Sequence, residues 1–168
     1  NMLNFPDFRA HERSFQLMLQ VSGRAGRTDK RGKVLIQTYN PYHKILQQVS
    51  TNNYKEMFNE QLHERYNFKY PPFYRIIKIT IKHKDYDRVN MASEWFAKSL
   101  RQVFKANILG PEFPPVSRIR NQYHKNILIK IAPKQSLAKT KAAIAKINTS
   151  FSLVKDFRPL RVIINVDN

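Results

Sequence analysis

Residues 75–110 read RIIKITIKHKDYDRVNMASEWFAKSLRQVFKANILG and set the pattern of the fold. Polar and apolar residues alternate loosely over 75–82, which predicts a β-strand. A short strand is predicted over 106–109, and Gly110-Pro111 is expected to stop it. Between the two strands, residues 85–105 predict an amphipathic helix, because apolar residues recur on one helical face. These apolar residues are Val89, Ala92, Phe96, Leu100 and Val103.

The same alternation of elements continues to the end of the chain. Residues 122–131 predict a long strand, Ser136 is expected to cap a helix to about residue 147, and residues 160–166 predict a final strand. The order from residue 74 onward is therefore β-α-β-β-α-β. This order is typical of the split-βαβ, or ferredoxin-like, arrangement, in which two helices cover one face of an antiparallel sheet. The expected fold class is α+β.

Shorter elements are predicted upstream. Asp7 can cap a first helix, which Gly23 and Gly26 are expected to close. The residues before Pro71 and Pro72 must be extended, so residues 70–73 end the last upstream helix. In chain order, the expected elements are a helix over 7–25, a strand buried on both faces over 34–39, a helix over 41–49 and a helix over 53–66.

Composition excludes several classes of protein. The 168 residues are 42% hydrophobic, which is enough for a core and excludes a disordered basic tail. No run of about 18 apolar residues is present, so no membrane span is expected, and no secretory signal is visible. The chain has no cysteine, which excludes disulfides and thiolate zinc sites and fits a reducing compartment. The five histidines are scattered, so no metal site is expected.

The charge is strongly positive and uneven. The formal net charge is +18, from 30 Lys and Arg against 12 Asp and Glu. No carboxylate occurs between Phe113 and Lys155. A surface of this kind attracts phosphates, so nucleic acid is the expected partner, and a basic structural protein or a membrane-surface binder are the alternatives. The candidate DNA-binding residues are Arg118, Arg120, Tyr123, Lys125, Lys78, Lys82 and Lys84.

Two of these assignments have a structural alternative. Tyr123 is equally explained as a strand residue that faces the core, with the nearby charges forming a solvated rim. Aromatic residues also gather around the Pro-Pro turn, where closure of the core between helix and sheet is the usual explanation. A base-stacking or peptide-binding groove is the alternative. These aromatic residues are Tyr54, Tyr66, Phe68, Tyr70 and Phe73.

One motif is distinctive: residues 20–27 read QVSGRAGR. Arg24 and Arg27 lie near one face at a helix end, and the glycines allow a ligand to approach the backbone closely. A guanidinium group matches phosphate oxygens, and across an interface it can act as an arginine finger on a γ-phosphate. The alternative is a glycine-rich helix C-terminus whose basic residues complement the helix dipole.

Residues 20–27 resemble the last motif of superfamily-two helicases. Together with residues 3–13, 32–38, 64–75 and 108–111, they resemble the family of primosomal protein N′ (PriA), the bacterial replication-restart helicases. The resemblance covers essentially the whole chain and is strongest over 3–39 and 64–75.

The resemblance implies roles for particular residues. Arg24 and Arg27 would face the γ-phosphate as arginine fingers, and Gln20 and Gly23 would belong to the nucleotide site. Residues 7–13 would couple that site to DNA. Residues 1–50 would be a remnant of the second, RecA-like helicase lobe, and residues 51–168 would be the family's C-terminal DNA-binding domain.

The resemblance also implies an activity for the whole protein. Members use ATP and Mg²⁺ to unwind DNA 3′→5′ at stalled or branched forks in the bacterial cytoplasm, and they restart replication by primosome assembly. They carry cysteine-bound zinc and contact single-stranded DNA-binding protein. This chain lacks the P-loop, the acidic motif and the cysteines, so it is expected to bind DNA without hydrolysing ATP. The alternatives are a basic RNA-binding protein of ribosomal type and a protein-interaction domain.

Overall fold

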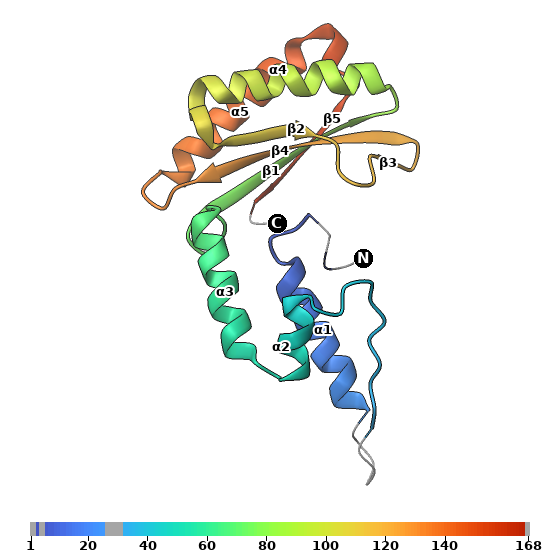
Figure 1. The fold of residues 1–168 in the computed structure, drawn as a ribbon. Helices are drawn as coiled ribbons and strands as arrows, with labels where there is room; N and C mark the ends of the chain where they lie inside the picture. Colours follow the sequence, from blue (N-terminus) through green and yellow to red (C-terminus); the bar gives the residue numbers. More distant parts are fainter. Residues whose placement is uncertain (1–2, 4–5, 26–31, 167–168) are drawn as a thin grey trace. The chain divides into compact units, whose positions relative to one another are not determined.

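The computed structural model describes residues 3, 6–25 and 32–166, which belong to two units (Figure 1). The N-terminal unit spans Asn1–Phe68 and the sheet unit spans Lys69–Asn168.

The sheet unit is an α+β fold with a five-stranded antiparallel sheet. Strand order is β2-β4-β1-β5, with β3 paired to β4, and α4 and α5 cover one face (Figure 1). This order confirms the predicted split-βαβ arrangement. The elements are β1 (Arg75–His83), α4 (Tyr86–Phe104), the 3₁₀ turn η1 (Lys105–Asn107), β2 (Ile108–Glu112), β3 (Arg118–Ile119), β4 (Gln122–Ile131), α5 (Leu137–Leu153), η2 (Lys155–Phe157) and β5 (Arg161–Val166).

The core lies between the sheet and its two helices. Alternate isoleucines of β1 and β4 face the helices, and each is fully or almost fully buried. Side chains of this size contribute about 1.5–3 kcal/mol each when buried. Opposite them, α4 provides Phe96 and Leu100, and α5 provides Phe151. Within the sheet unit, α4 and α5 lie on the same face, so no described helix of this unit covers the other face, which we call the helix-free face (Figure 1).

Three details of the sheet unit differ from prediction. Strand β2 does not stop at Gly110-Pro111 but continues to Glu112. Proline is tolerated there because β2 is an edge strand whose pairing with β4 is irregular. Helix α5 extends beyond residue 147 to Leu153, because Phe151 packs against Phe96 at 5.3 Å between ring centroids. The two-residue strand β3 was not predicted.

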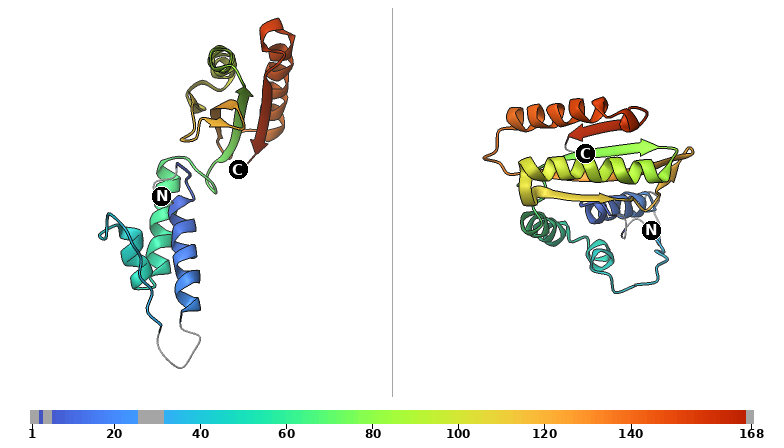
Figure 2. Two further views of the ribbon diagram at one scale, coloured as in Figure 1. Left: turned by 90° about the vertical axis from the view of Figure 1, so that its right-hand side faces the viewer. Right: turned by 90° about the horizontal axis from the view of Figure 1, so that it is seen from above.

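The N-terminal unit is a group of three helices: α1 (Ala10–Arg24), α2 (Lys44–Ser50) and α3 (Tyr54–Asn67) (Figure 2). A small core of Phe15, Ile45, Val49 and Met57 holds them together. The predicted cap by Asp7 is wrong, because the N-cap of α1 is Arg9 and no side chain caps the helix. The Asp7 carboxylate instead accepts hydrogen bonds from the Arg9 backbone N–H at 2.9 Å and from Arg13 at 2.8 Å, just before the helix begins.

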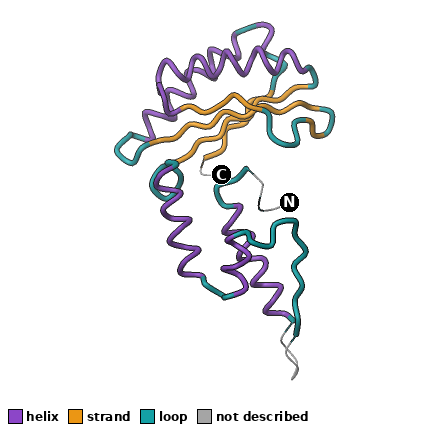
Figure 3. The backbone as a smooth tube through the Cα atoms, viewed as in Figure 1, coloured by secondary structure: helices purple, strands orange, loops and turns teal. Residues whose placement is uncertain are grey.

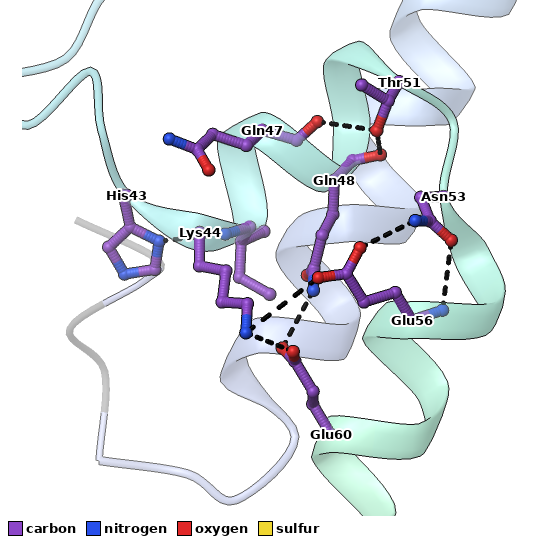
Figure 4. A network of polar contacts seen from close by, with 9 residues as sticks. His43, Lys44, Gln47, Gln48, Thr51, Asn53, Glu56 and Glu60 are labelled. Carbon is purple, nitrogen blue, oxygen red and sulfur yellow. Dashed lines mark hydrogen bonds and ion pairs between the residues drawn. The ribbon is translucent and has the colours of Figure 1, made fainter.

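Polar contacts join α2 to α3 (Figure 4). Lys44 forms an ion pair with Glu60, and the Gln48 amide donates to the same carboxylate at 2.8 Å. These contacts raise the pKa of Lys44 and lower the pKa of Glu60, because each charged form gains a hydrogen-bonded partner. Asn53 caps α3 by accepting the Glu56 backbone N–H at 3.1 Å.

The predicted buried strand over 34–39 is wrong. These residues form an extended loop, in which the Leu35 side chain is 96% exposed (Figure 3). An extended segment becomes a strand only when another strand supplies hydrogen-bond partners. No strand occurs among the described residues of the N-terminal unit, so this apolar run has no sheet to join.

Candidate nucleic-acid interface

The candidate interface is the helix-free face of the sheet. Side chains alternate between faces along each strand, so Lys78, Thr80 and Lys82 of β1 point away from the core isoleucines Ile77, Ile79 and Ile81 and share their face with Ile76. The pairing of β1 with β4 puts His124 and Asn126 on the same face. Lys78 and Lys82, two of the candidate DNA-binding residues, therefore lie on the same side of β1.

A row of three basic residues crosses this face. Lys82 pairs with His124 of β4 on one side and with Arg161 of β5 on the other. We call these three residues the basic row. Directly opposed residues have Cβ atoms about 5 Å apart, and like charges at that separation destabilise a sheet. The row therefore costs stability in the isolated chain and suits an anionic ligand.

His124 has an unusual protonation equilibrium. Burial lowers its pKa, the charge of Lys82 lowers it further, and a hydrogen bond with the Ile119 backbone acts in the opposite direction. The charge of Lys82 thus favours the neutral form of the His124 imidazole. An anion placed against the row would reverse that preference, because it would offset the Lys82 charge.

The rest of the face mixes polar and apolar side chains, because strand pairing also puts Leu128 of β4 and Ile163 of β5 on it. The Thr80 hydroxyl donates to the Asn126 side-chain oxygen at 2.8 Å, and Lys78 lies between Leu128 and Asn165. Asn126 is also paired with Glu112, a carboxylate on the β2 edge. This face thus presents Lys78 and Lys82 of β1 with the hydrogen-bonded Thr80 and Asn126 between them.

The β3–β4 hairpin carries the two predicted arginines. Arg120 and Asn121 form its two-residue loop, with φ values of 49° and 60°. Positive φ at both loop positions is the pattern of a type I′ turn. The Arg118 side chain donates to the Asn121 side chain, and its guanidinium carbon lies 5.2 Å from the centre of the Tyr123 ring. Arg118 therefore braces the hairpin, whereas the loop presents Arg120 to solvent.

Lys125 does not lie with the other candidates. It is on the helix-covered face and is 8% exposed. Its Nζ lies 2.9 Å from the Asn90 oxygen and 3.4 Å from a Glu94 carboxylate oxygen, both on α4. Alternation puts Lys125 on the same side as the buried Ile127, opposite Lys78 and Lys82, and its predicted contact with DNA stays a prediction.

Tyr123 shares the helix-covered face with Lys125. Its ring meets Tyr86 of α4 edge-on, at 5.3 Å between centroids, and it packs against the core. The interpretation of Tyr123 as a core-facing strand residue therefore fits better than base stacking. Lys84 lies beyond the end of β1 in an exposed turn, outside the basic row.

The helicase-like motif is in the N-terminal unit. Gln20, Gly23 and Arg24 are exposed on the last turns of α1. A Cβ atom added at Gly23 would meet nothing within 4 Å, so packing within the described chain does not require glycine there. Arg27 and Gly26 lie outside the described residues.

The aromatic residues near the Pro-Pro turn belong to different surroundings. Tyr54 stacks on Phe58 at 6.0 Å within the N-terminal unit. Within the sheet unit, the Lys130 ammonium lies 3.9 Å from the centre of the Tyr70 ring. Burial lowers the pKa of Lys130, and the charge of Lys69 lowers it further.

Two other features are absent from the described residues. No group of three or more His, Asp or Glu residues there is arranged to hold a metal ion. No described helix has the length and apolar composition needed to cross a membrane.

Sequence reasoning missed Arg161 as a member of this surface, and it grouped His124 with the basic residues of 118–125 without naming it as a DNA contact. The alternation of the strand could have placed His124 on this face, because His124 is one residue away from the buried positions of β4. Arg161 is a lone cation at the start of an apolar strand. Only the pairing of β5 with β1 shows that it opposes Lys82.

Comparisons with known proteins agree on one family. A family model described as "Primosomal protein N C-terminal domain" matches residues 66–168. Replication restart protein PriA of Bacillus subtilis (strain 168) is 34% identical over 167 residues, which cover 98% of this chain and 20% of that protein. The PriA of Synechocystis is 36% identical over 132 residues, covering 77% and 16%, and that of Haemophilus influenzae is 33% identical over 162 residues, covering 91% and 22%. The chain thus spans about a fifth of the length of these relatives.

Proposed function

The chain belongs to the family of the primosomal protein N C-terminal domain, and from that membership we propose that it serves as a DNA-binding module in the restart of replication. Its surface acts on the phosphate backbone of branched or single-stranded DNA. Phosphate contacts position a protein on nucleic acid without reading sequence, as recognition of a fork by its shape requires.

The observation that carries this proposal is the helix-free face of the sheet. Lys78 and the basic row lie there, and Glu112 is the carboxylate that strand pairing brings closest to them. Within the sheet unit, α4 and α5 lie on the opposite side of the sheet and do not cover this face (Figure 1). Arg120 extends the cationic surface at the hairpin loop.

Residues 20–27 fit a nucleotide site that is completed by another part of a longer protein. Gln20 and Arg24 are exposed, and the open space at Gly23 leaves room for a ligand to approach the helix. In that setting, these residues and Arg27 would hold the phosphates of ATP, whose Mg²⁺-bound γ-phosphate supplies the chemistry of an ATP-dependent helicase. The chain has no cysteine, so it does not fit a thiolate zinc site.

The test is binding of the 168-residue chain to labelled nucleic acids, measured by fluorescence anisotropy. A forked DNA, a blunt duplex, a single strand and a structured RNA are titrated at about 50 and 200 mM salt. We expect binding to DNA, with a preference for the fork that persists at the higher salt. Tighter binding to the RNA would instead support the ribosomal-type alternative, and failure to bind any DNA would contradict the proposal.

A matched pair of double variants locates the surface. Lys78→Gln with Lys82→Gln removes two positive charges from the helix-free face, and Lys139→Gln with Lys141→Gln removes two from the exposed side of α5. The first pair should lower the salt-dependence slope by about two, at about one per lost phosphate contact. Equal losses for the two pairs would mean that only net charge matters, and would remove the sheet face from the site.

A further inference from the structure

We propose that His124, Lys82 and Arg161 act together as one phosphodiester-binding row, and that His124 takes up a proton when the nucleic acid binds. This inference rests on the proposed function and deepens it. It adds two residues to the surface and predicts that the interaction depends on pH.

The row is assembled by strand pairing. Lys82 is directly opposed by His124 on β4 and by Arg161 on β5, so three adjacent strands place a basic side chain at one level of the sheet. A sheet gains stability from opposed charges of unlike sign. The row itself contains no negative charge. An anion that spans two strand spacings, of about 4.8 Å each, would supply one.

Hydrogen bonding gives His124 a specific role. A neutral imidazole has one N–H donor, and the hydrogen bond with the Ile119 backbone occupies a ring nitrogen. The other nitrogen of a neutral ring is an acceptor and repels a phosphate oxygen. The protonated ring has two donors, so it can keep the Ile119 contact and donate to the phosphate at the same time.

The neighbours of His124 explain why the proton arrives with the ligand. The adjacent cation on β1 is Lys82, with Arg161 beyond it on β5. On the β3 side, the Ser117 carbonyl accepts the His124 backbone N–H at 2.8 Å.

Two carboxylates lie further from His124. Glu94 is on the far side of the sheet, beside Lys125. Glu112 opposes Asn126, the next residue of β4 on the same face. The nearest charge thus disfavours the histidinium, and a bound phosphate is what makes it favourable.

The first test measures affinity against pH. The chain is titrated with the forked DNA at about pH 8 and about pH 6, which span the ordinary pKa of histidine. We expect the affinity to rise by up to about tenfold at the lower pH, which corresponds to a rise of about one unit in the pKa of His124 on binding. His124→Gln should remove most of that rise, whereas His63→Gln, on the exposed side of α3, should retain it.

The second test needs no variant. Calorimetric titration of the unaltered chain in two buffers with different ionisation enthalpies reports the protons taken up per DNA bound. We expect net uptake near neutral pH. Binding without proton uptake would overturn the role of His124 even if its variants failed to fold.

The third test addresses Arg161. Arg161→Gln should weaken DNA binding and lower the salt-dependence slope by about one, whereas Arg158→Gln, an exposed residue just before β5, is the charge-matched control. If DNA binds but neither pH nor Arg161→Gln alters it beyond the control, this inference fails and the proposed function stands. If the unaltered chain does not bind DNA, the proposed function itself fails.

Discussion

At the scale of single residues, Arg120 shows how the hairpin combines backbone conformation with charge. Its φ of 49° lies in the left-handed region, which suits glycine or asparagine better than arginine. A two-residue turn with Asn or Gly at this position would be more stable. The loop instead places a guanidinium at the tip of β3 and β4, where the proposed surface uses it.

Arg120→Gly should therefore separate stability from binding. We expect the variant to be more stable to urea by about 0.5–1 kcal/mol, because glycine adopts positive φ without a steric penalty. We expect its DNA affinity to fall. Denaturation followed by Trp95 fluorescence gives the stability, and Arg158→Gly is the control for loss of charge outside the hairpin. Lower stability of Arg120→Gly would show that the arginine side chain supports the turn.

His124 makes the stability of the sheet unit depend on pH. Its pKa is lowered in the folded chain, so the unfolded chain binds the proton at a higher pH than the folded chain. Between the unfolded value of about 6.5 and the lower folded value, the unfolded state holds more protons, and stability falls as pH falls.

We therefore expect His124→Gln to lose less stability than the unaltered chain between about pH 7.5 and about pH 5.5. Thermal unfolding followed by circular dichroism in the absence of nucleic acid measures this difference. His63→Gln should behave as the unaltered chain does. A steeper loss in His124→Gln would reverse the assigned direction of the His124 pKa shift.

At the scale of elements, α5 is longer than its periodicity predicts because tertiary packing extends it. Phe151 lies in its last turn and contacts Trp95 and Phe157 as well as Phe96. This aromatic cluster joins α4, α5 and the turn before β5. The packing of α5 thus helps to place β5, and with it Arg161.

Phe151→Ala should cost about 3–5 kcal/mol of unfolding free energy, as expected for a buried aromatic residue. Leu153→Ala lies two residues further along, where the side chain is 70% exposed, and should change stability by no more than about 0.5 kcal/mol. Urea unfolding of both variants makes the comparison. Equal small effects would mean that the end of α5 is not held by this cluster.

At the scale of the whole molecule, salt should affect folding and binding in opposite directions. Repulsion within a chain of net charge +18 is screened as salt rises, and so is attraction to phosphate. We expect the melting temperature of the isolated chain to rise between about 50 and 200 mM NaCl while its DNA affinity falls. Arg161→Gln should show a smaller rise, because one repulsive pair in the row is already gone. A melting temperature that does not respond to NaCl would contradict this account.

How far the sequence predicts the molecule depends on the range of the interactions involved. Strand β1, helix α4 and strand β4 follow from local periodicity, and so does their order. Strand β3 is shorter than any periodic pattern, and the Arg120-Asn121 loop lacks the usual Asn-Gly signal.

The candidate site was less predictable, because it depends on pairing between distant strands. Nothing near Lys82 in the sequence shows that Arg161 will oppose it. The face on which Lys125 lies, by contrast, could have been predicted. Lys125 shares the alternation of Ile127 and Ile129, so the pattern that predicted the strand also predicted its face.

The basic row makes the stability of the fold depend on what the chain is bound to. The opposed cations Lys82 and Arg161 destabilise the sheet, and a ligand that binds only the folded chain shifts the folding equilibrium by mass action. At a ligand concentration of about 100 Kd, this shift is about 2.7 kcal/mol. Nucleic acid carried through purification would therefore behave as a structural component, and removing it with nuclease and high salt would expose the lower intrinsic stability of the polypeptide.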